Sequence, residues 1–128
     1  MGAEPAEYNP VSTVPFRGNN VSDYLIVLTT MPDRAQAEAL AGRLLEQKLA
    51  ACINLLPPMT SMYTWQGRVE KEDEHLMLIK TRTSRYEDLA VTVREHHPYE
   101  VPELIAVDIV AGLPEYLDWV GESTGQQE

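Results

Sequence analysis

Residues 50–81, AACINLLPPMTSMYTWQGRVEKEDEHLMLIKT, decide the fold of this chain. The dipeptide Gln66-Gly67 supplies a turn between two strand-like arms, which predicts a β-hairpin. Each arm has roughly 15 residues and would reach about 50 Å at ~3.4 Å per residue. A compact chain of this size is only ~35 Å across. The hairpin should therefore protrude, and Pro57-Pro58 predicts a bulge that bends its first arm.

A protruding two-stranded ribbon is only marginally stable in water by itself. This one carries large apolar side chains at Met59, Met62, Tyr63 and Trp65. The ribbon is therefore expected to pack on another subunit and to bury its aromatic rings there. The charged run Glu70-Lys71-Glu72-Asp73-Glu74 in the second arm is interpreted as a solvated stretch.

The segments before the hairpin contribute a strand and a helix. Residues 25–30 are an apolar, β-branched run without alternation, which is typical of a strand covered on both faces. Pro32-Asp33 opens a helix, with Gln36 placed three residues after Asp33 in the capping-box relation. The apolar stripe of this helix extends to Leu45 and the stem of Lys48.

After the hairpin, Ser84 is the predicted cap of a second helix, with Glu87 three residues later, and this helix stops before Pro98. Residues 104–110 form another strand, and Pro114 lies near the start of a short final helix. The order βαββαβ plus a terminal helix predicts an α+β, ferredoxin-like fold, with both internal helices on one face of an antiparallel sheet. Such a fold implies no activity by itself.

Composition restricts the partners. The chain has 128 residues, 44% of them apolar, which suits a single domain. Its net charge of -10 argues against nucleic acid as a partner, and no apolar run is long enough to span a membrane. The single cysteine, Cys52, is interpreted as a core residue and fits a reducing compartment such as the cytoplasm. Residues 1–22 are predicted to be a disordered tail, 23–122 the folded domain and 123–128 a frayed end.

The segment His96-His97-Pro98-Tyr99-Glu100-Val101-Pro102-Glu103 is the main candidate site. Each proline restricts its own backbone and that of the residue before it, so the segment should be stiff. Imidazoles and carboxylates suit divalent cations, which makes His96, His97 and Glu103 candidate metal ligands. The alternative is an ordinary helix end, where histidine complements the helix dipole and proline stops the helix.

Lys80 and Tyr99 are candidate ligand-binding residues. Lys80 lies near the end of a strand and could bind an anion where subunits meet, or simply pair with a carboxylate. Tyr99 could line a cleft between subunits, or simply pack. The sequence shows no nucleophile–base pair, glycine-rich phosphate loop, CxxC or HExxH motif, so we expect no enzymatic activity.

Several short motifs resemble those of the CutA family of divalent-cation tolerance proteins. Each motif is weak by itself, and the resemblance rests on their common order and spacing. The resemblance covers about residues 24–119. Its motifs are Thr30-Met31-Pro32, Leu49-Ala50-Ala51-Cys52-Ile53-Asn54, Ser61-Met62-Tyr63-Thr64-Trp65-Gln66-Gly67, Lys80-Thr81, His97-Pro98-Tyr99 through Pro102-Glu103, and Tyr116-Leu117-Asp118-Trp119.

The resemblance implies a ferredoxin-like homotrimer, similar in build to the PII signalling proteins, with a role in tolerance of copper and other divalent ions and no defined reaction. It also implies a copper site on a first-strand cysteine and paired histidines, positions that correspond here to Thr29, His96 and His97. A hydroxyl is a poor substitute for a thiolate towards Cu(I). We therefore expect only weak binding of Cu2+ or another divalent cation, and no obligatory cofactor.

Three functions remain open from the sequence. The first is a trimer that binds divalent cations weakly through histidine and carboxylate groups. The second is a PII-like regulatory trimer that binds a small ligand in the clefts between its subunits. The third is a mainly structural trimer whose effect on metal tolerance is indirect.

Overall fold

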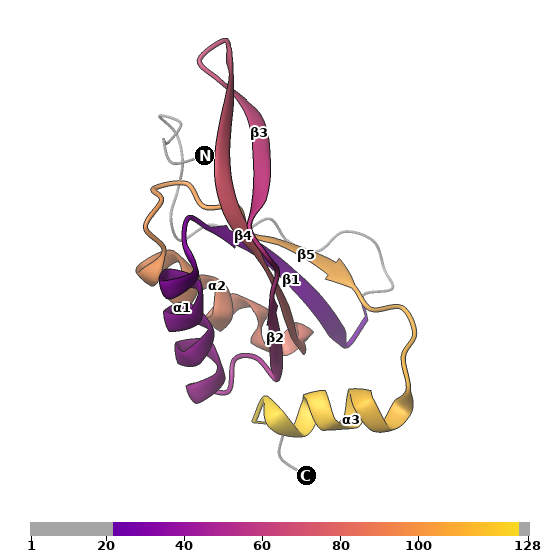
Figure 1. Cartoon of the computed structure of the whole chain (residues 1–128). Helices are drawn as coiled ribbons and strands as arrows, with labels where there is room; N and C mark the ends of the chain where they lie inside the picture. The colour runs from indigo at the N-terminus through magenta and orange to yellow at the C-terminus, as the bar shows by residue number, and fades with distance from the viewer. Residues whose placement is uncertain (1–21, 126–128) are drawn as a thin grey trace.

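The computed structural model describes residues 22–125, which form one antiparallel sheet with three helices (Figure 1). The strands are β1 (Tyr24–Met31), β2 (Cys52–Leu55), β3 (Met59–Trp65), β4 (Arg68–Arg82) and β5 (Ile105–Asp108). The helices are α1 (Arg34–Glu46), α2 (Tyr86–His96) and α3 (Pro114–Ser123), with a single 3₁₀ turn, η1 (Thr83–Arg85), before α2. The predicted disordered tail lies outside the described residues except for Ser22, whose hydroxyl donates to the Ile109 carbonyl at 2.7 Å.

The sheet has the strand order β2-β4-β1-β5, and β3 pairs with the far half of β4. All four pairings are antiparallel. Together with the element order, this arrangement confirms the predicted ferredoxin-like α+β fold. The strand predicted at residues 104–110 is present, but β5 is shorter than expected.

The hairpin protrudes from the body of the molecule as predicted (Figure 1). Gln66 and Gly67 both have positive φ angles, 52° and 78°, as a two-residue turn of the mirror-image type requires. On β4, Leu55 pairs with Met77 whereas Met59 pairs with Glu74. The first arm therefore holds one more residue than its partner across the Pro57-Pro58 interruption, which confirms the predicted bulge.

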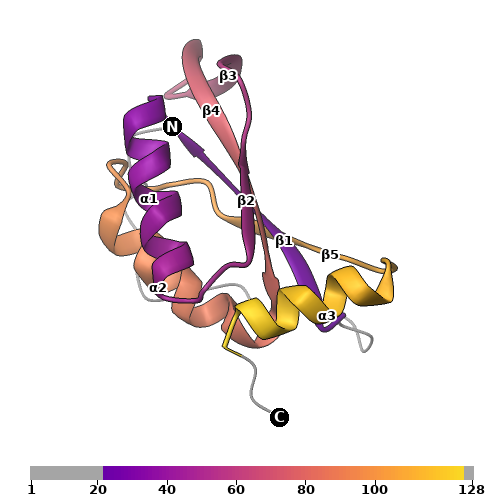
Figure 2. The ribbon, with the colours of Figure 1, turned by 60° about the horizontal axis from the view of Figure 1, so that its bottom comes forward.

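Helices α1 and α2 cover only one face of the sheet (Figure 2). Alternate residues of β1 and β4 point into this core, so that Leu25, Val27, Met77 and Ile79 are fully buried. The residues between them on β1, such as Ile26 and Leu28, are only half-buried in the single chain. The prediction that the first strand is covered on both faces is therefore wrong for one chain by itself.

The first helix begins as the sequence predicts. The Asp33 carboxylate accepts the Gln36 backbone N–H at 2.8 Å, and the Gln36 side-chain amide donates back to Asp33 at 2.7 Å. The predicted apolar stripe runs too far, since Leu45 is exposed and Lys48 lies beyond the helix with a φ of 60°. The predicted cap of the second helix is also wrong, because Ser84 lies inside η1 and α2 begins at Tyr86.

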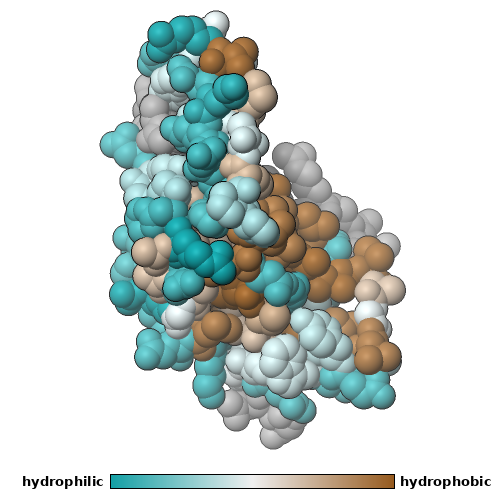
Figure 3. All heavy atoms as spheres, viewed as in Figure 1, coloured by the Kyte–Doolittle hydropathy of each residue, from teal (hydrophilic) through white to brown (hydrophobic). Residues whose placement is uncertain are grey.

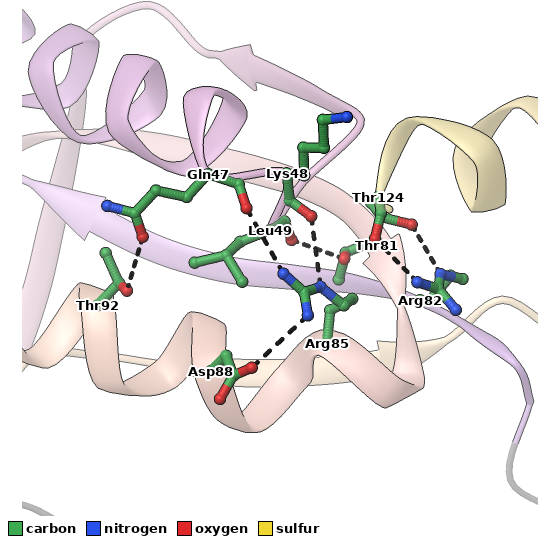
Figure 4. Close-up of polar contacts among 9 residues, drawn as sticks. All are labelled: Gln47, Lys48, Leu49, Thr81, Arg82, Arg85, Asp88, Thr92 and Thr124. Atoms are coloured by element: carbon green, nitrogen blue, oxygen red, sulfur yellow. Dashed lines mark hydrogen bonds and ion pairs between the residues drawn. The ribbon is translucent and has the colours of Figure 1, made fainter. Parts of the chain in front are cut away.

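The C-terminal helix is tied to the sheet through Arg82 (Figure 4). The guanidinium of Arg82 donates to both the hydroxyl and the carbonyl oxygen of Thr124, each at 2.8 Å. Thr124 is fully buried, and α3 itself includes Ser123. The ordered fold thus continues past the predicted frayed end at residue 123, because a buried threonine holds it.

Candidate functional site

The segment between α2 and β5, residues 97–104, passes the base of the ribbon (Figure 1), and we call it the strap. Its first residue, His97, is buried, with Nε2 2.7 Å from the carbonyl oxygen of Thr30. The backbone N–H of Tyr99 donates to Nδ1 of the same ring at 3.2 Å. Nε2 must then carry the hydrogen and donate to Thr30, so the ring is neutral. Burial lowers the pKa of His97 accordingly.

The two adjacent histidines therefore have different roles in the structure. Both ring nitrogens of His97 are engaged by backbone groups, and the ring pins the strap to the end of β1. His96 is the last residue of α2, and its side chain is exposed to solvent. Of the two imidazoles, only that of His96 offers a free approach to an ion from solution.

Glu74, at the base of the ribbon, is completely buried, contrary to the expectation that its charged run is solvated. The hydroxyl of Tyr99 donates to Glu74 Oε2 at 2.8 Å. Burial of Tyr99, and its bond to Glu74, raise the pKa of the phenol well above its ordinary value. The sequence contained one signal for the burial of Glu74. This residue alternates with Leu76 and Leu78 and therefore lies on the same face of β4 as they do.

Glu103, at the other end of the strap, is half-buried. Its backbone carbonyl accepts the hydroxyl of Thr29 at 2.6 Å, which fixes the end of the strap against β1. Burial raises the pKa of the Glu103 carboxyl, and the nearby charge of Glu74 raises it further. Thr29 is fully buried, and its hydroxyl is used in this bond.

The geometry does not join His96, His97 and Glu103 into one metal centre within the single chain. His97 uses both nitrogens in the fold and His96 faces solvent, so the paired imidazoles do not converge. Among residues 22–125, no group of three or more histidine, cysteine or acidic side chains is placed to hold one ion. A tight three-ligand copper site therefore does not fit the donors of one chain.

Lys80 and Tyr99 also lie apart. Lys80 is on the sheet face away from α1 and α2, where its ammonium group donates to the Asn54 side chain and lies 4.0 Å from the Cys52 sulfur. Cys52 is half-buried on this face and is not part of the core, contrary to its sequence interpretation. Tyr99 contacts Glu74, six positions from Lys80 and so about 20 Å along the strand.

The sheet face that lacks α1 and α2 is apolar, and the other residues of the described range 22–125 leave it largely uncovered. Figure 3 shows apolar side chains gathered in the centre of the molecule and towards β5. Ile105 and Val107 are each 51% exposed, and Leu113 and Trp119 further along the chain are 67% and 43% exposed. Ile105 and Val107 pair with the half-buried Leu28 and Ile26, and these four residues form what we call the open face. Apolar patches of this kind on a folded chain mark interaction surfaces.

The class of protein is now defined: a ferredoxin-like α+β chain with a long ribbon, a polar strap at the ribbon's base and an uncovered apolar sheet face. Residues 25–123 match the family model "CutA1 divalent ion tolerance protein", and the chain belongs to this family. The resemblance inferred from the sequence motifs is thereby confirmed.

Individual relatives agree with this assignment. The chain is 46% identical over 100 residues to the divalent-cation tolerance protein CutA of Thermus thermophilus, covering 78% of this chain and 97% of the relative. It is 42% identical to a protein of Arabidopsis thaliana named CutA, chloroplastic, of which it covers 55%. The crystal structure of CutA1 from Oryza sativa superposes with a TM-score of 0.80 at 38% identity, covering 84% of this chain and 98% of that one. Within the described residues, no helix is long and apolar enough to cross a membrane.

Proposed function

We propose that this chain is a homotrimeric, non-enzymatic divalent-cation tolerance protein that binds Cu2+ and related ions weakly. Membership of the CutA1 family supports the tolerance role. The cytoplasm is the compartment we propose for it, since its one cysteine is free and suits a reducing environment. The observation that carries the proposal is the open face, because it needs a partner.

The open face and the ribbon support self-association. Ile105 and Val107 expose about half of their surface on this sheet face. The ribbon leaves Met62 at 63% and Val69 at 67% exposed, far from the core. Other copies of the chain would supply the missing apolar cover for both elements, as in an obligate assembly whose interface resembles a core.

The trimer is tested by sedimentation equilibrium of the full chain at micromolar concentration. Wild-type protein should show three times the chain mass. Val107→Asp places a charge on the open face and should dissociate the trimer, whereas the matched control Glu115→Lys, on an exposed position of α3, should not. A monomer mass for wild-type protein would contradict the proposal.

Weak metal binding is proposed for exposed side chains, with His96 as the principal ligand. Its imidazole is solvent-accessible, and the net charge of -10 concentrates cations near the surface. His97 and Glu103 enter only if the strap rearranges, since His97 would have to give up two hydrogen bonds.

Calorimetric titration with Cu2+ tests this ligand. His96→Ala should weaken binding about tenfold, in line with the loss of one imidazole ligand. The neighbouring exposed carboxylate in Glu95→Gln provides a matched control and should leave the affinity within a factor of two or so of wild type. Undiminished Cu2+ binding by His96→Ala would rule out this placement.

A second candidate function is a PII-like regulatory trimer that binds a small anion between subunits. Lys80 supports it, because no carboxylate among the described residues forms an ion pair with this cation, whose ammonium group donates to Asn54 and lies near Cys52. A thermal-shift screen with nucleotides and organic anions tests it, since a ligand of the native state raises the melting temperature. A hit that persists in Lys80→Met would exclude this residue.

A further inference from the structure

Two buried oxygen atoms beneath the strap have no hydrogen-bond partner. They are Oε1 of Glu74 and Oγ1 of Thr30, in residues that are 0% and 2% exposed. Buried polar atoms in folded proteins almost always have a partner, either a protein group or an enclosed water or ion. Two such atoms in one region therefore indicate that something small lies between protein groups there.

The strand register brings these two residues to the same side of the sheet. Thr30 on β1 pairs with Leu76 on β4, and Glu74 lies two residues from Leu76. Residues two apart on a strand share a face, so Thr30 and Glu74 are diagonal neighbours on one side of the sheet. The strap closes over them, because Tyr99 bonds to Oε2 of Glu74 and His97 bonds to the Thr30 carbonyl.

A second carboxylate lies at the same place. The bond from the Thr29 hydroxyl to the Glu103 carbonyl holds Glu103 beside the end of β1, one residue from Thr30. The charge of Glu74 is close enough to raise the pKa of the half-buried Glu103 carboxyl. The backbone bond and the electrostatic interaction thus bring a second carboxylate into the neighbourhood of Glu74 and Thr30. Three other titratable groups that interact with Glu74 are Tyr63 on β3, and His97 and Tyr99 on the strap.

The occupant must be small. The two unpartnered atoms have almost no contact with solvent, so neither a side chain of another subunit nor an organic ligand can reach them. A water molecule would satisfy the hydrogen bonds but would not offset the repulsion between the Glu74 and Glu103 carboxylates. A cation satisfies both requirements, and oxygen-only donors select hard ions such as Mg2+, Ca2+ and Mn2+ over soft Cu(I).

We propose that Oε1 of Glu74, the Glu103 carboxylate and Oγ1 of Thr30 form an oxygen-donor site for one hard divalent cation, enclosed by the strap. Waters and backbone carbonyls complete its coordination, as is usual for these ions. The site does not rest on the function proposed above, since it uses neither His96 nor a second subunit. It adds a structural cation that locks the strap onto the base of the ribbon.

The experiment uses the full chain, stripped with a chelator and titrated with Mn2+, with the free ion followed by its electron paramagnetic resonance signal. Wild-type protein should bind one Mn2+ per chain with a dissociation constant of about 0.1–1 mM, typical of weak oxygen-ligand sites. It should also melt at a higher temperature with the ion present. Glu74→Gln keeps the shape of the side chain and should weaken binding about tenfold or more.

Glu100→Gln is the matched control, because this carboxylate lies on the same strap but is exposed, and Mn2+ binding should be unchanged. Thr30→Val leaves both carboxylates in place and provides a second test if Glu74→Gln does not fold. His96→Ala should leave Mn2+ binding intact while reducing Cu2+ binding, which separates the two proposals. No Mn2+ bound by wild-type protein at millimolar concentration, or equal binding by Glu74→Gln and Thr30→Val, would overturn the site and leave an enclosed water as the occupant.

Discussion

Tyr99→Phe should destabilise the protein substantially. The Tyr99 hydroxyl donates to Oε2 of Glu74 at 2.8 Å, and the acceptor belongs to a residue with no exposed surface. Its other oxygen, Oε1, already lacks a partner, so the variant would leave the whole carboxyl group without a protein donor. Hydrogen bonds to charged groups contribute about 1.5–3 kcal/mol. We expect the free energy of unfolding to fall by roughly that amount.

Urea denaturation at one fixed protein concentration measures this change, because stability and assembly are linked in an oligomer. Tyr116→Phe is the control, because the ring of Tyr116 is partly exposed on α3. This variant should change the free energy of unfolding by no more than about 0.5 kcal/mol. In a Glu74→Gln background, Tyr99→Phe should cost less, since the two residues interact directly. A Tyr99→Phe variant as stable as Tyr116→Phe would refute the reasoning.

The same bond gives a dependence on alkaline pH. The pKa of Tyr99 is raised in the folded state, so the neutral phenol is favoured by folding. Its contribution to stability is complete below the unfolded pKa of about 10 and is lost as the pH rises above it. Wild-type protein should therefore lose more stability than Tyr99→Phe between pH 9 and pH 11, as followed by urea midpoints. Equal losses would show that Tyr99 is not the group involved.

Three further outcomes are expected. Asp33→Ala removes the cap bonds with Gln36 and should lower the unfolding free energy by about 1 kcal/mol in urea titrations; no change would mean that the cap is not formed. Gly67→Ala forces a side chain into a left-handed turn position at φ 78° and should cost about 1 kcal/mol, with weaker assembly in sedimentation experiments. Because burial lowers the pKa of His97, its contribution to stability is present above pH 6.5 and lost as the pH falls below it. His97→Asn should therefore flatten the change in melting temperature between pH 7.5 and 5.5, and an unchanged slope would exclude this histidine.

The order of the elements and the protruding ribbon could be predicted from the sequence because their determinants are local. The Asp33–Gln36 cap, the Gln66-Gly67 turn and the Pro57-Pro58 bulge each act within a few residues of themselves. The errors at Lys48 and Ser84 concern where a helix ends and begins. Packing against the sheet decides such boundaries, and the periodic pattern continues past them.

The chemistry at the base of the ribbon could not be predicted from the sequence, because it depends on contacts between distant parts of the chain. The sequence indicated that residues 96–103 hold polar groups on a stiff backbone, but not which groups face inwards. Only the folded strap brings His97 onto Thr30, 67 positions away, and Tyr99 onto Glu74, 25 positions away.

Burial is the physical reason why the sequence predicted the architecture but not the chemistry at the base of the ribbon. In the sequence, Glu74 is one of several acidic residues in a charged ribbon, and His96 and His97 are equivalent neighbours. When the strap closes, it removes Glu74 from water and divides the two histidines between the surface and the interior. The sequence by itself therefore determined the family, the α+β architecture and the ribbon. The tertiary structure decided which carboxylate and which imidazole are desolvated, and desolvation controls what each of them can bind.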